Sequence, residues 1–173
     1  MISEVYIPRR TEALKEDFFA RHADVVAKDL LGKTLVRERQ NAATLYAIIS
    51  EVASFEGSQE DSMTEGALYA PGTLIVSTKH GKKMLDIATY QICKPSCVTL
   101  ISAVIGDQRG VREVVEGPGN LTKVLEIDKD SFHGLPIRLS PIWIGGQAVE
   151  EDRIVKRNKS SVPRNCKGYF YFK

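Results

Sequence analysis

Cysteine is scarce in this chain of 173 residues, which contains only Cys93, Cys97 and Cys166. An odd number of thiols at these spacings matches no zinc-binding pattern, and the three histidines do not supply a second ligand pair near Cys93 and Cys97. We therefore expect buried or free thiols rather than metal ligands.

Long apolar runs are also missing, since no stretch approaches the roughly 20 apolar residues of a membrane helix. The first residues, "MISEVYIPRRTEALKEDFF", are charged throughout and lack the apolar region of a secretory signal. Internal repeats and low-complexity segments are absent from the sequence. These features predict one soluble, intracellular domain over residues 1–173.

Excess charge of one sign is small, because the formal net charge is +2, too little to indicate a nucleic-acid-binding protein by itself. The distribution is more informative. Seven Lys or Arg residues and no acid lie between Arg153 and the end, whereas the first sixty residues hold eight basic and ten acidic ones. A basic tail therefore follows a nearly neutral body.

Apolar periodicity predicts an α+β fold with a single, curved and largely antiparallel sheet flanked by helices. Residues 11–31 have helical spacing and stop at Gly32, and residues 117–127 form a Gly-Pro-Gly turn that opens a second helix. A short helix is also expected over 108–116, and residues 56–67 are expected to form a polar loop. The predicted strands occupy residues 33–39, 44–51, 73–77, 84–89 and 96–104, followed by one or two in the basic tail.

Glu51 stands at the expected end of the strand that begins at residue 44. Taken alone, such an acid is most simply an exposed residue at a strand end. It is also suited to act as a catalytic base if the rest of the chain supplies a substrate site.

The clearest predicted hairpin, residues 73–89, carries Lys79, His80, Gly81, Lys82 and Lys83 at its tip. One interpretation is a solvated turn that lysine keeps soluble. The other is a protruding, DNA-probing hairpin, in which a flat imidazole enters the minor groove while the ammonium groups bind phosphates.

Residues 116–123, "EGPGNLTK", place backbone amides behind a tight turn. They suit either an anion such as a phosphate, with Asn120 and Lys123 nearby, or a helix start that needs this geometry. The segment is neither a Walker loop nor a dinucleotide-binding fingerprint, which disfavours an enzyme that uses a nucleotide cofactor.

In combination, "DLLGKTLVR", "IISEV", "LYAPGTLIVSTKHG", "MLDIAT", "CVTLISAV" and "GPGNLTKVLEI" resemble the ordered motifs of the alkyladenine (3-methyladenine) DNA glycosylase family. The resemblance covers roughly residues 18–170. It implies a monofunctional purine DNA glycosylase that needs no metal and no other cofactor, flips an alkylated or deaminated purine out of duplex DNA and hydrolyses its N-glycosidic bond in base excision repair. In a prokaryote such an enzyme would work in the cytoplasm at the nucleoid, and in a eukaryote it would work in the nucleus.

The same resemblance implies the site residues. Glu51 matches the acid that activates water, His80 the intercalating Tyr, and Asp86 the Asn that reads the flipped base. The tip lysines, Gly81, Asn120 and Lys123 are then DNA-binding. The expected base pocket comprises Phe55, Ser77, Asp86, Leu100 and Ser102.

Several positions depart from the family pattern. Ser62 or Glu65 stands in place of a loop His, Ile75 and Ser77 replace a pair of Tyr, and Ser102 replaces an Arg. The aromatic after the acid is Phe55 if two residues are inserted, and otherwise the position is Ala53. Losing two stacking faces, each worth about 1 to 3 kcal/mol, would weaken base capture.

Three functions therefore stay open: an active glycosylase that works as a monomer, a nucleic-acid-binding relative with altered specificity or no catalysis, and a protein-interaction domain built on the same scaffold. Glu51 favours the enzyme, whereas Ser77 and Ser102 favour the binder.

Overall fold

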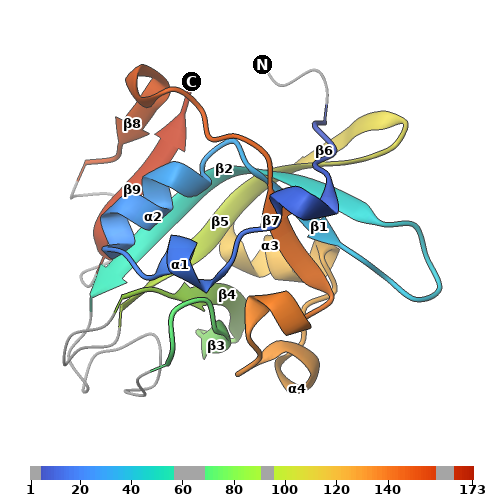
Figure 1. Cartoon of the computed structure of the whole chain (residues 1–173), viewed down its shortest axis with the longest axis horizontal. Helices are drawn as coiled ribbons and strands as arrows, with labels where there is room; N and C mark the ends of the chain where they lie inside the picture. The colour runs from blue at the N-terminus through green and yellow to red at the C-terminus, as the bar shows by residue number, and fades with distance from the viewer. Residues whose placement is uncertain (1–4, 57–68, 91–95, 159–165) are drawn as a thin grey trace.

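The computed structural model describes residues 5–56, 69–90, 96–158 and 166–173 (Figure 1). Within these residues, nine strands form one antiparallel sheet. The strands are β1 (Thr34–Arg37), β2 (Leu45–Glu56), β3 (Leu74–Lys79), β4 (Lys82–Ala88), β5 (Ser96–Asp107), β6 (Gly110–Val115), β7 (Ile142–Gly145), β8 (Ile154–Lys156) and β9 (Cys166–Phe172).

The helices are short and lie around this sheet. The α-helices are α1 (Glu16–Phe19), α2 (Ala23–Leu30), α3 (Pro118–Val124) and α4 (Lys129–Phe132), and the 3-10 turns are η1 (Arg10–Glu12), η2 (Ile137–Leu139) and η3 (Glu151–Arg153). The predicted α+β class with an antiparallel sheet is confirmed.

The long strands β2 and β5 form the centre of the sheet, because each pairs with two partners along one edge (Figure 1). β2 pairs with β1 near its start and with β9 near its end, while β5 pairs with β4 and then β6. α2 packs on β2, β5 and β9, and α3 packs on β4 and β5. Buried side chains from both helices and from the sheet form one main hydrophobic cluster, so the sheet curls around a single core.

The two predicted hairpins are confirmed. β1 pairs with β2 from Thr34–Ile48 to Arg37–Leu45, and β3 pairs with β4 up to Lys79–Lys82. The second hairpin has a two-residue loop, His80–Gly81, in which both residues have positive φ, at 51° and 75°. This combination defines a type I′ turn, whose twist matches that of the flanking strands.

The segment 11–31 does not form the single helix that its apolar spacing predicted. It forms η1, α1 and α2, with breaks over residues 13–15 and 20–22. His22 caps α2 by accepting a hydrogen bond from the amide of Asp24 at 3.2 Å, and Gly32, at φ 85°, ends the segment as expected.

The helix predicted over 108–116 is wrong, because these residues form β6, the return strand of a hairpin with β5. Asp107 accepts a hydrogen bond from the amide of Arg109 at 2.8 Å, which closes the turn before Gly110. The β-branched Val111, Val114 and Val115 fit a strand, and their backbone pairs the free edge of β5.

The strand that contains Glu51 also continues beyond its predicted end, to Glu56. The pairing of β2 with β5 shifts register on both sides of Glu51. Ile49 and Val52 both lie in the main core cluster, so the bulge adds one residue to the alternation. Glu51 therefore leaves the core face without ending the strand.

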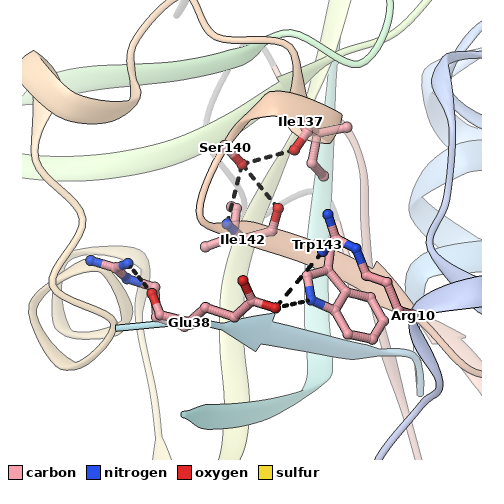
Figure 2. A network of polar contacts seen from close by, with 7 residues as sticks. Arg10, Glu38, Ile137, Ser140, Ile142 and Trp143 are labelled. Carbon is pink, nitrogen blue, oxygen red and sulfur yellow. Dashed lines mark hydrogen bonds and ion pairs between the residues drawn. The ribbon is translucent and has the colours of Figure 1, made fainter. Parts of the chain in front are cut away.

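The last strand of the sheet edge, β7, is fixed by a polar network (Figure 2). The Ser140 hydroxyl lies 2.9 Å from the carbonyl oxygens of both Ile137 and Ile142. The Trp143 indole donates to Glu38 Oε1 at 3.1 Å, and the Arg10 guanidinium lies over the Trp143 ring. This network joins η1, Glu38 just after β1, and β7.

Candidate active site

Glu51 lies at the bulge of β2, where three side chains bind its carboxylate. Arg157 Nη2 is 2.9 Å from Oε1, and the Tyr169 hydroxyl donates to Oε2 at 2.8 Å. Ser102, its cross-strand neighbour on β5, donates to Oε2 at 3.4 Å and accepts from the amide of Gly117 at 3.2 Å. The Glu51 side chain is 19% exposed, so it is oriented by the protein yet reachable from solvent.

Arg157 follows β8 and is positioned by the aromatic strand β9. Its amide donates to the carbonyl of Tyr169 at 2.8 Å, and its guanidinium lies 5.2 Å and 4.9 Å from the centroids of the Tyr169 and Tyr171 rings. The hydrogen bond to Glu51 raises the pKa of the Arg157 guanidinium. Because the ion pair is fixed by stacking on two rings, it restricts the Glu51 carboxylate more than a mobile surface pair would.

Tyr169 has a raised pKa, first because the phenol is half-buried and then because it hydrogen-bonds to the Glu51 carboxylate. Both effects disfavour the phenolate, so the hydroxyl stays protonated and donates. Neither Tyr169 nor the pairing of Arg157 with Glu51 was predicted from the sequence. The available signals were the alternating aromatics of "GYFYF" and the acid-free tail, but neither indicates a contact with residue 51.

A cavity of about 360 Å³ lies between the β3–β4 hairpin and the central strands. Its lining is mainly apolar and aromatic, and comprises Ala53, Phe55, Lys79, His80, Met84, Thr99, Ile101, Pro118 and Tyr169. Tyr169 belongs to this lining and its hydroxyl donates to Glu51, so the carboxylate lies beside the cavity, one side chain away. The volume falls within the usual range for small-molecule sites.

The predicted pocket residues differ in where they lie. Phe55 lines the cavity, and Ser102 contacts Glu51 beside it. Leu100 belongs to the main core, beneath the opposite face of β5 from Thr99 and Ile101. Adjacent strand residues point to opposite faces, so we do not retain Leu100 in the site.

Asp86 and Ser77 are buried below the cavity. The Asp86 carboxyl is fully buried and accepts hydrogen bonds from Ser77 Oγ at 2.9 Å and from Thr99 Oγ1 at 2.6 Å. Burial raises the pKa of Asp86 to about 7, because loss of water disfavours the charged form more than the two hydrogen bonds favour it. Thr99 therefore separates a buried carboxyl from the cavity.

The hairpin tip lies beside the start of α3. The Thr122 hydroxyl lies 3.0 Å from the carbonyl of Lys83, and a Cβ added at Gly119 would be 3.2 Å from the Lys82 side chain. The expected protrusion of the hairpin is not confirmed, since one side of the tip packs on α3. Glycine at 119 permits this close approach.

A second cavity, of about 530 Å³, is lined by residues of both the tip and α3. The predicted DNA-binding residues divide between the two cavities: Lys79 and His80 line the first, while Gly81, Lys82, Lys83, Asn120 and Lys123 line the second, which we call the lysine groove. Glu126 and Asp128 also line the groove. The exposed lysines of the tip therefore lie close together, next to the first, apolar cavity.

Some predictions fall outside the described residues, namely the polar loop with Ser62 and Glu65, and the thiol of Cys93. Cys97 and Cys166 are free thiols, the first buried and the second half-buried, as predicted. In the described part of the chain, no group of three His, Cys, Asp or Glu residues could hold a metal ion. No described helix is long and apolar enough to cross a membrane.

Comparison with known proteins gives a consistent result. Residues 17–171 match the family described as methylpurine-DNA glycosylase. The chain is 29% identical over 154 residues to an Aeropyrum pernix protein named "Putative 3-methyladenine DNA glycosylase", covering 82% of this chain and 78% of that protein. An Anaeromyxobacter protein of the same name is 26% identical over 162 residues, covering 86% and 80% of the two chains. The chain therefore belongs to the methylpurine-DNA glycosylase family of DNA-repair enzymes, as a divergent member.

Proposed function

We propose that this protein releases an alkylated or deaminated purine from duplex DNA by hydrolysing its N-glycosidic bond, with Glu51 as the general base. The observation that carries the proposal is a fixed carboxylate beside an apolar cavity, with a basic hairpin along the same cavity. Membership of the methylpurine-DNA glycosylase family indicates that the substrate is DNA.

DNA binding is assigned to the hairpin tip and the lysine groove. Lys82, Lys83 and Lys123 would contact backbone phosphates, and their release of counterions would supply much of the affinity. His80 is exposed at the centre of the type I′ turn, from which its ring would enter the base stack and take the place of the flipped nucleotide.

The flipped base would occupy the apolar cavity. Losing the family's Tyr pair suggested thin stacking walls, but Phe55 and Tyr169 supply two aromatic side chains from other strands. Aromatic stacking tolerates different bases, and it contributes about 1 to 3 kcal/mol per base.

Catalysis would use the unfilled acceptor capacity of Glu51. A carboxylate has about four acceptor positions, and Arg157 binds Oε1 while Tyr169 and Ser102 bind Oε2. Oε1 can still accept a proton from water. The water oxygen then bonds to C1′ of the sugar, the bond from C1′ to the base nitrogen breaks with its electrons moving to the base, and the water proton passes to Glu51.

The carboxylate has a second effect, because positive charge develops on the sugar as the base leaves. A fixed negative charge near C1′ stabilises that transition state. Water is the nucleophile, so the product is an abasic site in an unbroken strand. The enzyme would act as a monomer.

The test is a single-turnover assay on duplex oligonucleotides that each contain one modified purine. We expect at least one lesion to yield an abasic site, detected as strand breakage only after alkali. Tight, salt-sensitive binding without release of any base would instead identify a non-catalytic DNA-binding relative.

A further inference from the structure

Asp86 is a carboxyl group that the proposed reaction does not use. Its side chain lies within the protein, and its Oδ1 is 2.6 Å from the hydroxyl of Thr99, a residue that lines the apolar cavity. Met84, two positions earlier on β4, lines the same cavity and shares its face of the strand. A ligand in contact with Thr99 would therefore be one hydroxyl group away from Asp86.

The charge of Asp86 has no cationic partner among the described residues. Its hydrogen-bond partners, Ser77 and Thr99, are both neutral. Glu51, the other carboxylate beside the cavity, is paired with Arg157. The two acids thus differ: an arginine pairs with Glu51, whereas no cation in the described part of the chain pairs with Asp86.

Burying an unpaired carboxylate is unfavourable, and a cation brought near it relieves the cost. We propose that Asp86 is a buried counter-charge for the flipped base, and that this enzyme thereby prefers purines made cationic by N-alkylation over neutral purines of the same shape. The inference rests on the proposed function, because it assumes that a flipped base occupies the apolar cavity.

The basic side chains at the cavity do not cancel this effect. Lys79 and His80 line its mouth and are exposed, so solvent and salt screen them. Asp86 is shielded from water, where a charge acts over several ångströms with less screening. Burial raises the pKa of Asp86 to about 7, so at pH 8.5 the carboxyl is charged and available to a cation.

The preference can be measured by binding, without cleavage. Two duplexes would carry either 7-methyladenine, a fixed cation, or 7-deaza-7-methyladenine, a neutral base of the same outline. A 2′-fluoro sugar in both would suppress hydrolysis by destabilising positive charge on the sugar. Dissociation constants at pH 8.5 would be compared for the unmodified protein, Asp86→Asn and the control Asp107→Asn, which makes the same change at the far end of β5.

An opposite charge within about 4 to 6 Å shifts an equilibrium between charged and neutral forms by 10- to 1000-fold. We expect the unmodified protein and Asp107→Asn to bind the cationic duplex at least tenfold more tightly than the neutral one. Asp86→Asn should reduce this ratio to within about twofold. The amide has the size of the carboxyl, so the cavity should keep its shape.

Equal binding of the two duplexes by the unmodified protein would overturn the inference, and that comparison needs no variant to fold. A cation preference that survives Asp86→Asn would overturn it as well. Failure to release any base from cleavable DNA is a separate result, which would refute the glycosylase activity rather than the role of Asp86 in binding.

Discussion

Replacing Asp86 by Asn should stabilise the protein in alkaline solution and have little effect in acid. The Asp86 pKa is raised from 3.8 to about 7 in the folded state because the carboxyl is fully buried. Above pH 3.8 the unfolded chain loses this proton while the folded protein keeps it, so stability falls progressively until about pH 7 and then levels off. The shift of about three units corresponds to roughly 4 kcal/mol at 1.36 kcal/mol per unit.

This magnitude is large enough for equilibrium urea unfolding at pH 4 and pH 8.5. At pH 8.5 we expect Asp86→Asn to unfold at a higher urea concentration, and its melting temperature to be higher by about ten degrees for a chain of this size. At pH 4 the two proteins should differ little. The other carboxyl groups are the same in both proteins. The change with pH in the stability difference between the two proteins therefore reports the titration of Asp86. If Asp86→Asn destabilised the protein equally at both pH values, the claim that Asp86 is buried and neutral in acid would be refuted.

Three other predictions concern the hairpin and the C-terminal strands. With 2-aminopurine beside the lesion, His80→Ala should lose most of the fluorescence increase that accompanies binding, while keeping salt-sensitive affinity. The fluorescence increase with His80→Tyr should equal or exceed that of the parent protein. A fluorescence increase that survives His80→Ala would contradict intercalation by His80. Changing Lys82 and Lys83 to Gln should reduce the slope of log affinity against log salt by about two, and an unchanged slope would exclude phosphate contacts there. Arg157→Ala should slow base release at least tenfold while DNA affinity is retained, and Arg157→Lys should partly restore the rate. The control is Arg153→Ala, just before β8, which removes an arginine stacked on Phe172 of β9 and should leave the rate unchanged. Equal effects of the two alanine variants would show that Arg157 is only structural.

The strands that build the site could be predicted because their signals are local. Alternating apolar residues and a His80–Gly81 turn specify the β3–β4 hairpin, and the observed pairing ends at Lys79–Lys82. Such patterns need only short-range information.

The missed features depend on contacts between distant segments. Residues 110–115 place Val111, Val114 and Val115 at helical spacing, yet they form β6 because the edge of β5 requires a hydrogen-bonding partner. The bulge at Glu51 is visible only in the pairing of β2 with β5, and without it the acid reads as the end of a strand.

The candidate site was predicted in part for the same reason. Glu51 and the hairpin tip could be named from the order of motifs along the chain. The contact of Tyr169 and Arg157 with Glu51 joins residues more than one hundred positions apart, through the pairing of β9 with β2. Leu100 could not be separated from Thr99 and Ile101 until the buried face of β5 was known.

The central claim, that Glu51 activates water for base release, is tested most directly by single-turnover kinetics of Glu51→Gln on the best lesion found. The matched control is Glu56→Gln, at the end of the same strand, where the carboxylate pairs with His22. Glu51→Gln should keep the fold and lesion binding while slowing base release by at least about a hundredfold, the lower end of what a general base supplies. Glu56→Gln should match the parent protein. Equal release rates for Glu51→Gln and the parent would contradict the account.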